Sequence, residues 1–355
     1  VISIFLMILT SYYFSVVGLV CVLLYGIYRY IEDKKNDKIT VKDFFREGFK
    51  FIFVMLIPVL LSCFLLLPTA YSLLDGRTAT NKSISLLELF IPNFDISNTL
   101  YSSYSLGCSA IFIIALIYGI VTKKREVKVI SIIFSILLVF PICDYVFNGG
   151  MYLNGKAFIP LLPLAILLIG YFLMNIFNNK SKLKISIIIS LIIVVINLFV
   201  FVYKREYLCL LFVVEMVLLI IFLLISYKLE KKYVLYVYLC ILSLIIVIPT
   251  NFSDIFVTKE FYDTLDYEET SDKVQQVLDR DNSFYRMSDQ SVKLDKSNKI
   301  YDIDYYTGSI YSSLSNSYYK DFYNNLINNE FIYRSYGMLT GNNNIFYNFY
   351  MGNKY

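Results

Sequence analysis

The chain has 355 residues, 57% of them hydrophobic, and its mean hydropathy of +0.61 is too high for a soluble globular protein of this length. Its formal net charge is +4 and it contains no histidine. The lack of histidine excludes serine–histidine and cysteine–histidine nucleophile pairs and removes the commonest metal ligand. Chemistry at this chain would therefore rest on carboxylates, Lys, Arg, Tyr or an oxygen-bound metal.

Eight long apolar runs follow one another through the first 250 residues. Most contain about 18–24 residues, the length that an α-helix needs to cross about 30 Å of hydrocarbon. They cover residues 1–28, 51–74, 105–122, 129–147, 157–177, 185–203, 207–227 and 233–250. The sequence predicts a mainly α protein whose residues 1–250 form a polytopic transmembrane helix bundle of about eight spans.

The first run begins at Val1, already inside apolar sequence, and is interrupted by Thr10-Ser11-Tyr12-Tyr13. We expect residues 1–10 to be the end of a helix whose start lies upstream, and residues 13–28 to form the next helix. The chain is also expected to continue beyond Tyr355. Prolines inside later runs predict bent helices, for packing or to shape a cavity. They are Pro58, Pro68, Pro160 and Pro163.

Basic residues alternate in density between successive loops. The loops at 29–50, 123–128, 178–184 and 228–232 hold 17 Lys and Arg in total, whereas those at 75–104, 148–156 and 204–206 hold five. Basic loops stay in the cytoplasm, so the first set is predicted to face inward and everything after Asn251 to lie outside the cell. The basic excess suits anionic lipid headgroups and argues against nucleic acid as a partner.

Residues 251–355 have a different composition, with 15 of the 33 Tyr, 13 Asn and no Cys. Apolar spacing predicts one helix over 262–281, and the segments 283–287 and 300–306 are typical of short strands. We expect a small extracellular α+β domain, rich in β-structure. Its Tyr and Asn side chains suit carbohydrate binding, and they suit an ordinary β-rich domain equally well.

Two carboxylates lie within the apolar runs. Glu215 stands roughly 12 Å along the run 207–227, at about 1.5 Å per residue, and Asp144 lies near the outer end of the run 129–147. A buried carboxylate is costly in hydrocarbon and faces either a polar partner or a wet cavity. Each residue therefore belongs to a substrate or proton site, or makes a structural contact, for which Asn197 is the expected partner of Glu215.

The outer loops supply two cations. Arg77 lies just beyond Pro68-Thr69-Ala70-Tyr71, where a guanidinium can bind a lipid-linked phosphate by charge-assisted hydrogen bonds. An interfacial anchor is the alternative role for Arg77. The second outer loop is rich in Gly and Asn, begins at Asn148 and places Lys156 at the same outer surface.

Several short motifs occur in a characteristic order. They are Leu67-Pro68-Thr69-Ala70-Tyr71 with Arg77, Phe147-Asn148-Gly149, Ser283-Phe284-Tyr285-Arg286, Gly308-Ser309-Ile310-Tyr311-Ser312-Ser313-Leu314-Ser315-Asn316, Tyr319-Lys320-Asp321-Phe322-Tyr323 and Met351-Gly352-Asn353-Lys354-Tyr355. In this order the chain resembles the YfhO family of bacterial membrane proteins over nearly its whole length. Two positions depart from the family pattern. Asn353 stands where Val is usual, and Lys156 stands near a position that typically carries Arg.

The resemblance implies an activity and its partners. YfhO proteins are similar to GT-C glycosyltransferases, which move a sugar from a polyprenyl-phosphate donor on the outer face of the membrane. The implied acceptor is a cell-envelope polymer such as lipoteichoic acid of a Gram-positive bacterium, and membrane lipids are the other partners. The implied substrate-binding residues are Arg77, Lys156, Glu215, Asp144 and Asn148. The catalytic acidic residue is expected upstream of Val1, and a divalent metal stays an open alternative.

Two other classes of function remain as alternatives. A transporter or flippase of lipid-linked sugars would use Glu215 and Asp144 in its path, and a nonenzymatic envelope-assembly protein would use the outer domain as a binding module. The sequence shows no inverted repeat and no matched pair of broken helices, which argues against the transporter.

Overall fold

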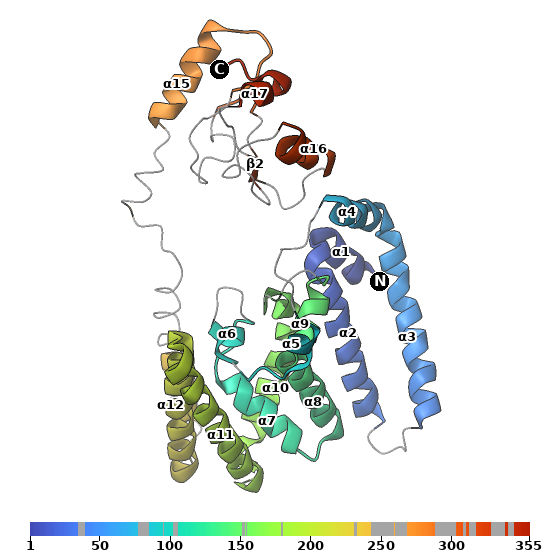
Figure 1. Cartoon of the computed structure of the whole chain (residues 1–355). Helices are drawn as coiled ribbons and strands as arrows, with labels where there is room; N and C mark the ends of the chain where they lie inside the picture. The colour runs from blue at the N-terminus through green and yellow to red at the C-terminus, as the bar shows by residue number, and fades with distance from the viewer. Residues whose placement is uncertain are drawn as a thin grey trace. The chain divides into compact units, whose positions relative to one another are not determined.

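A computed structural model describes most of the chain. It covers residues 1–34, 40–76, 85–94, 96–101, 106–150, 153, 155–178, 180–230, 233–242, 259, 268–287, 303–307, 310–311, 317–327, 338–339 and 344–355. The chain divides into two compact units, one formed by residues 1–63 and 80–256 and the other by residues 64–79 and 257–355. Most helices of both units are labelled in Figure 1.

Every element of the first unit is a helix among the described residues. In chain order they are α1 (Ile2–Thr10), α2 (Tyr12–Asp33), α3 (Val41–Leu61), α5 (Leu86–Phe90), α6 (Ile96–Tyr101), α7 (Ile111–Val121), α8 (Arg125–Val139), α9 (Pro141–Phe147), η1 (Gly155–Leu161), α10 (Leu162–Asn175), η2 (Ile176–Asn178), α11 (Lys180–Lys204), α12 (Tyr207–Leu229) and a helix over Tyr233–Leu242. The mainly helical class is therefore confirmed.

Four helical segments are long and apolar enough to cross a membrane. They are Tyr12–Asp33, Gly155–Asn178, Ser181–Tyr203 and Tyr207–Leu229. Two bent helix pairs, α3 with α4 (Cys63–Gly76) and α8 with α9, raise the number to six if each pair is one span. Each predicted apolar run contains a helix, but α7 and the helix Tyr233–Leu242 are shorter than a span among the described residues. The chain is a multi-pass membrane protein, and four to six spans of full length are found among the described residues where eight were expected.

The break near the start of the chain is confirmed. Ser11 has an extended backbone, with φ −158° and ψ 100°, and it separates α1 from α2. Its hydroxyl accepts a hydrogen bond from the backbone N–H of Phe14 at 3.3 Å, which caps the first turn of α2. The polar Thr-Ser pair therefore ends one helix and starts the next.

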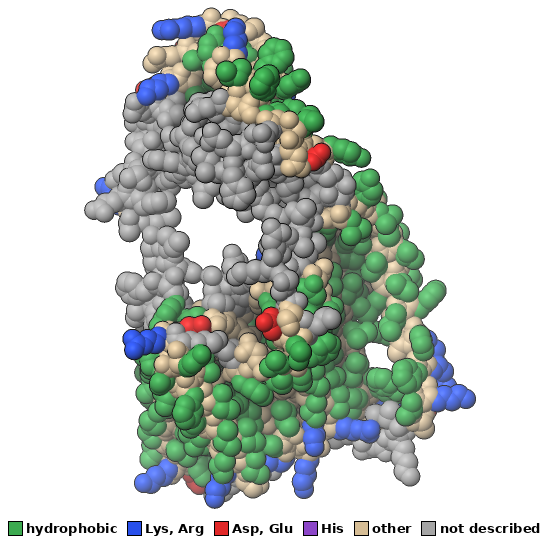
Figure 2. All heavy atoms as spheres, in the orientation of Figure 1, with side chains coloured by type: hydrophobic (Ala, Val, Ile, Leu, Met, Phe, Trp, Pro, Cys, Tyr) green, Lys and Arg blue, Asp and Glu red, His purple; other side chains and the backbone are tan. Residues whose placement is uncertain are grey.

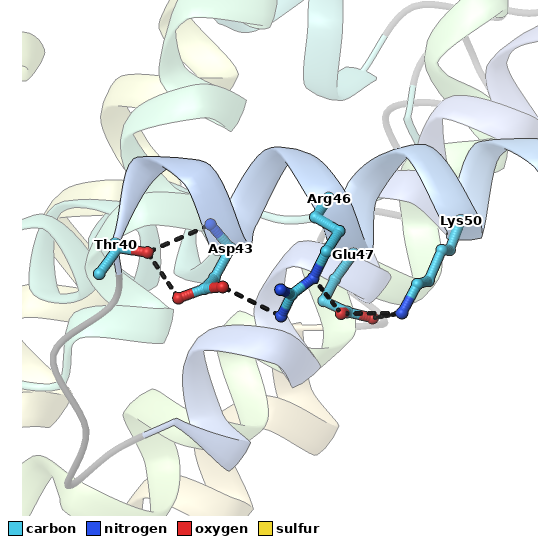
Figure 3. Close-up of polar contacts among 5 residues, drawn as sticks. All are labelled: Thr40, Asp43, Arg46, Glu47 and Lys50. Carbon is cyan, nitrogen blue, oxygen red and sulfur yellow. Dashed lines mark hydrogen bonds and ion pairs between the residues drawn. The ribbon is translucent and has the colours of Figure 1, made fainter.

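The predicted cytoplasmic loop 29–50 is largely helical, which corrects the sequence-based boundary. The helix α3 begins at Val41 because Thr40 caps it, accepting the N–H of Asp43 at 3.2 Å. Ion pairs then continue along the helix, from Asp43 to Arg46 at 3.0 Å and from Glu47 to Lys50 at 3.1 Å (Figure 3). Hydropathy missed these turns because their stability comes from a cap and from charge pairs three residues apart.

The run 129–147 is not one straight helix. It is divided into α8 and α9, which are bent by 83° at Phe140. Pro141 opens α9 and lacks the N–H that would continue α8, while the residue before a proline is driven to an extended conformation. Asp144 therefore lies on a separate short helix and not at the end of a straight span.

The centre of the first unit is α7. Nine of its eleven residues, Ile111–Gly119, are buried, and α7 contacts α8, α10 and α11. A helix that is apolar on all sides is typically buried in protein. Residues preceding it are also buried, with Leu106 at 2% and Ala110 at 0% exposure. The N-terminus of α7 therefore lies inside the bundle, where its backbone N–H groups need a protein partner.

The surface of the first unit agrees with a membrane environment. Figure 2 shows hydrophobic side chains over most of its visible height, with Lys and Arg side chains gathered at its lower end. At this end lie the end of α2, the beginnings of α8 and α11 and the end of α12 (Figure 1). These are the four basic segments that the sequence places on one side of the membrane.

The second unit is helical rather than β-rich among its described residues. Its elements are α4, α15 (Glu268–Arg280), β1 (Ile310–Tyr311), α16 (Ser317–Asp321), η4 (Phe322–Leu326), β2 (Met338–Leu339) and α17 (Ile345–Met351). The two short strands pair antiparallel. Of the predicted helix over 262–281, α15 covers Glu268–Arg280, and residues 262–267 lie outside the described residues. The strand-like segment 283–287 forms only isolated parallel bridges, Arg286 with Asn353 and Met287 with Thr307, and the described residues 303–306 form no strand. Tyr323 and Tyr347 are instead buried between helices, because strand preference depends on packing context.

The last residues of the chain are tied to the segment that follows α15. The N–H of Arg286 donates to the carbonyl of Gly352 at 3.0 Å, and the N–H of Lys354 donates to the carbonyl of Arg286 at 3.0 Å. Gly352 ends α17 with φ 67°, a left-handed conformation that favours glycine. Two motifs of the sequence, 283–286 and 351–355, are therefore joined by backbone hydrogen bonds. We call these two segments together the paired segment.

The stability of the paired segment is expected to depend on pH. The ammonium of Lys354 and hydrogen bonds from Ser283 and Tyr355 lower the pKa of Asp281, and Asp281 raises the pKa of Lys354. The pair therefore contributes stability above the ordinary Asp pKa of about 3.9 and loses it as pH falls toward the lowered value. Its contribution is also lost as pH rises through the raised pKa of Lys354, above the ordinary value of about 10.4.

We expect the amide hydrogen-exchange protection of Arg286 and Lys354 to be constant between pH about 5 and about 9. Asp281→Asn should lower this protection throughout that range. Asp321→Asn is the matched control, since Asp321 accepts a hydrogen bond only from the nearby Asn325 among the described contacts. Equal hydrogen-exchange protection in Asp281→Asn and the unchanged chain would show that the ion pair does not stabilise the paired segment.

Candidate functional site

Three predicted site residues meet at the beginning of α2. Asn148 donates through its amide nitrogen to the Asp144 carboxylate at 2.8 Å and to the Asp144 carbonyl at 2.9 Å. The Tyr13 hydroxyl donates to the Asn148 amide oxygen at 2.5 Å. The ammonium of Lys156 lies 5.1 Å from the centre of the Tyr13 ring. We call Tyr13, Asp144, Asn148 and Lys156 the polar cluster.

Local sequence explains how the polar cluster forms. The bend at Pro141 sets the direction of α9, and Asn148 closes its C-terminus. Gly149 and Gly150 follow with φ 67° and 72°, a left-handed conformation that other residues rarely adopt. The chain can therefore reverse within a few residues, so that η1, with Lys156 in its first turn, packs against both α9 and α2.

The polar cluster combines groups with complementary chemistry. Asn148 is 4% exposed, whereas Tyr13, Asp144 and Lys156 are partly exposed and accessible to a ligand. An ammonium binds phosphate as a compact point charge, and a carboxylate or amide accepts hydrogen bonds from hydroxyls. The aromatic ring beside the ammonium fixes the position of the cation by a cation–π interaction. The cluster can therefore bind a ligand that carries both an anion and hydroxyl groups.

Glu215 belongs to a different arrangement. It lies on α12 with an exposed fraction of 0%. Its carboxylate accepts the backbone N–H of Ala110 at 2.7 Å and a hydrogen bond from the Tyr101 hydroxyl. Ala110 is the N-cap residue of α7, so Glu215 supplies a hydrogen-bond acceptor to the buried N-terminus of that helix. The expectation that Glu215 faces away from lipid is confirmed.

The expected pairing of Glu215 with Asn197 is wrong. Asn197 is also fully buried, but its amide nitrogen donates to the carbonyls of Phe94 at 3.4 Å and Ile193 at 2.9 Å. The reason is that α6 packs against α12 and brings Tyr101 to Glu215. Tyr101, from the predicted outer loop 75–104, is therefore the hydrogen-bond partner of Glu215 in place of Asn197.

Two further contacts fasten α6 to α12. Ser97 lies 3.2 Å from the sulfur of Cys209, and the Asn98 amide donates to the Glu206 carboxylate at 3.3 Å. Together with Tyr101, these residues place three polar contacts along one side of α12. The contacts around Glu215 therefore connect both α6 and the N-terminus of α7 to α12.

The outcome differs among the five predicted site residues. Asp144, Asn148 and Lys156 are brought together, and Glu215 has its own set of partners. Arg77 lies outside the described residues. The sequence did not single out Tyr13 or Tyr101 as site residues, although the Tyr12-Tyr13 pair and the segment beginning at Tyr101 both stand out as polar interruptions near apolar runs.

Metal ligands are not grouped in the part of the chain that the structure describes. There, no three His, Cys, Asp or Glu side chains lie close enough together to hold a metal ion. The six cysteines are all free.

A family comparison covers nearly the whole chain. The family model described as Bacterial membrane protein YfhO matches residues 1–354. The chain belongs to the YfhO family. No curated protein and no solved structure matches it significantly. Membership in the YfhO family and the apolar helices together establish a multi-pass membrane protein, and the polar cluster lies within the matched region.

Proposed function

We propose that this YfhO protein takes part in transferring a sugar from a polyprenyl-phosphate donor to a cell-envelope polymer such as lipoteichoic acid. The polar cluster is the observation that carries the proposal. It places a cation, a carboxylate and an amide beside an aromatic ring at the end of α2 away from the basic loops. By the positive-inside bias that end faces the outside of the cell, where a lipid-linked donor and an envelope polymer meet.

Each residue of the polar cluster has a proposed part in binding. Lys156 contacts the phosphate of the donor, and Asp144 with Asn148 accepts hydrogen bonds from sugar hydroxyls. Tyr13 holds Lys156 and orients Asn148 through its hydroxyl. The donor tail lies among the apolar helices. These roles concern substrate binding alone.

The contacts of Glu215 favour transfer over proton-coupled transport. A transport residue must change its partners during the cycle, while Glu215 is fully buried and holds the N-terminus of α7 together with Tyr101. Losing these contacts would leave two buried donors without acceptors. Glu215 was the main sequence feature that favoured a transporter, and its contacts are those of a structural residue.

Lys156→Ala in the full-length protein tests the proposal. We expect polymer glycosylation to fall about tenfold or more, because a hydrogen bond to a charged group contributes about 1.5–3 kcal/mol. Lys124→Ala is the matched control, since Lys124 lies 5.0 Å from the centre of the Tyr171 ring and belongs to a basic loop. Full activity in Lys156→Ala, with normal membrane insertion, would overturn the assigned role.

The orientation has its own test. In a cysteine-free chain, a single Cys placed at Ser283 should react with an impermeant reagent added outside the cell, and one placed at Asn36 should be protected. The expectation follows from the 17 basic residues on one set of loops against five on the other. The reverse labelling pattern would place the polar cluster inside the cell and remove the basis of the proposal.

A further inference from the structure

A groove lies between α2 and α3, at the end of the first unit opposite to the polar cluster. Its volume is about 680 Å³, within the range of roughly 300–1,000 Å³ that is usual for small-molecule sites. Aromatic side chains make up much of its lining, with Tyr25 and Tyr30 from α2 and Phe45, Phe49 and Phe51 from α3. The two helices lie side by side in Figure 1.

The groove is amphipathic. Its charged lining residues are Arg29 and Asp33 in the last two turns of α2 and Glu47 near the start of α3, so they share one end. The rest of the lining is apolar or aromatic apart from glycine. Arg29 lies 16 residues beyond Tyr13 on the same helix, about 24 Å away at about 1.5 Å per residue. The groove is therefore distinct from the polar cluster.

The segment around the polar end is net basic, although the charged lining residues themselves are one cation and two carboxylates. Residues 29–50 contain seven basic and five acidic residues. Glu47 is already engaged by Arg46 at 3.2 Å and by Lys50 at 3.1 Å (Figure 3). Arg29 makes one hydrogen bond, to Glu32 at 2.5 Å, and a longer ion pair with Asp33 at 3.7 Å. A guanidinium has five N–H donors, so Arg29 can also bind a phosphate oxygen.

The helix α3 contacts α1, but few of its own side chains are buried. Only Met55 and Pro58 are buried among its 21 residues, while Phe49, Phe53 and Leu60 are more than half exposed. An occupant of the groove would bury apolar surface from both helices. It would thereby fix the position of α3 against α2.

We propose that this groove binds the acyl chains of an anionic glycerophospholipid, with its phosphate on Arg29. The aromatic and aliphatic lining contacts the chains, and the interfacial Tyr30 lies near the glycerol region. Basic residues at the cytoplasmic surface attract anionic lipids of that leaflet, which supplies the ligand at the correct depth. A second copy of the chain would need an apolar segment to fill the groove and would leave Arg29 without its anion.

Phosphatidylglycerol binding to the purified full chain in detergent tests this site, measured by native mass spectrometry with phosphatidylcholine as the zwitterionic comparison. Gly48→Leu should fill the groove, because a Cβ at Gly48, which lines it, meets no atom within 4 Å. We expect it to lower phosphatidylglycerol affinity about tenfold. Gly170→Leu is the matched control, since Gly170 on α10 has equally open space and lies outside the groove.

The headgroup is tested separately. Arg29→Gln should lower phosphatidylglycerol affinity about tenfold and leave phosphatidylcholine affinity unchanged, because the lost contact is with the charged headgroup. Lys228→Gln, which removes a cation in the last turn of α12 outside the groove lining, should leave both affinities unchanged. Unchanged phosphatidylglycerol binding in Gly48→Leu would overturn the proposal. So would equal binding of the two lipids, or binding of a polyprenyl phosphate in place of phosphatidylglycerol.

Discussion

Glu215→Ala should destabilise the helical bundle by about 2–6 kcal/mol. The substitution removes the acceptor of the Ala110 N–H and the Tyr101 hydroxyl. Each buried donor left without an acceptor costs about 1–3 kcal/mol. A large fall in the thermal unfolding temperature of the detergent-solubilised protein is the expected measurement.

Two variants separate the structural contact from other causes. Glu215→Gln keeps one amide oxygen as an acceptor and should lose far less stability than Glu215→Ala. Glu206→Ala removes a carboxylate from the same helix that accepts a hydrogen bond from Asn98 at 3.3 Å and is only partly buried. It should cost about 1 kcal/mol or less. If Glu215→Gln abolishes function while the fold stays intact, proton coupling, and not capping, is the role of Glu215.

Gly119→Ala should destabilise the protein by about 1–3 kcal/mol, the usual cost of overpacking a core. A Cβ at Gly119 would lie 2.0 Å from the Ser131 hydroxyl oxygen and 3.0 Å from the Ser131 Cβ. The helices α7 and α8 approach closely at this point, as transmembrane helices do where small residues face each other. Unfolding temperature again measures the effect.

Ser131→Ala is expected to rescue most of this loss. It removes the oxygen that collides with the new methyl group, and that oxygen has no hydrogen-bond partner among the described residues. Gly170→Ala is the control, because a Cβ there meets nothing within 4 Å and alanine favours a helix over glycine by about 1 kcal/mol. Equal stability of Gly119→Ala and Gly170→Ala would show that α7 and α8 are farther apart than the structure indicates.

The sequence by itself determined the membrane class, the places of the main helices and the family. Hydrocarbon offers no partner for backbone N–H and C=O groups, so runs such as 185–203 and 207–227 must be helical. The polar interruption at Ser11 located a helix break for the same reason that it caps α2. The burial of Glu215 also followed from the cost of a charge in lipid.

Only the tertiary structure decided which polar groups meet. Tyr13 reaches Asn148 across 135 residues and Tyr101 reaches Glu215 across 114, and no local pattern encodes such contacts. The bend at Pro141 was not among the predicted bends, and the direction of α9 depends on packing against α8 and η1. Strand-like segments in the second unit became bridges beside helices, because their aromatic residues found burial there. Local sequence fixes where the backbone can be helical, whereas partner choice depends on which buried donors and acceptors the packed helices bring within hydrogen-bond distance.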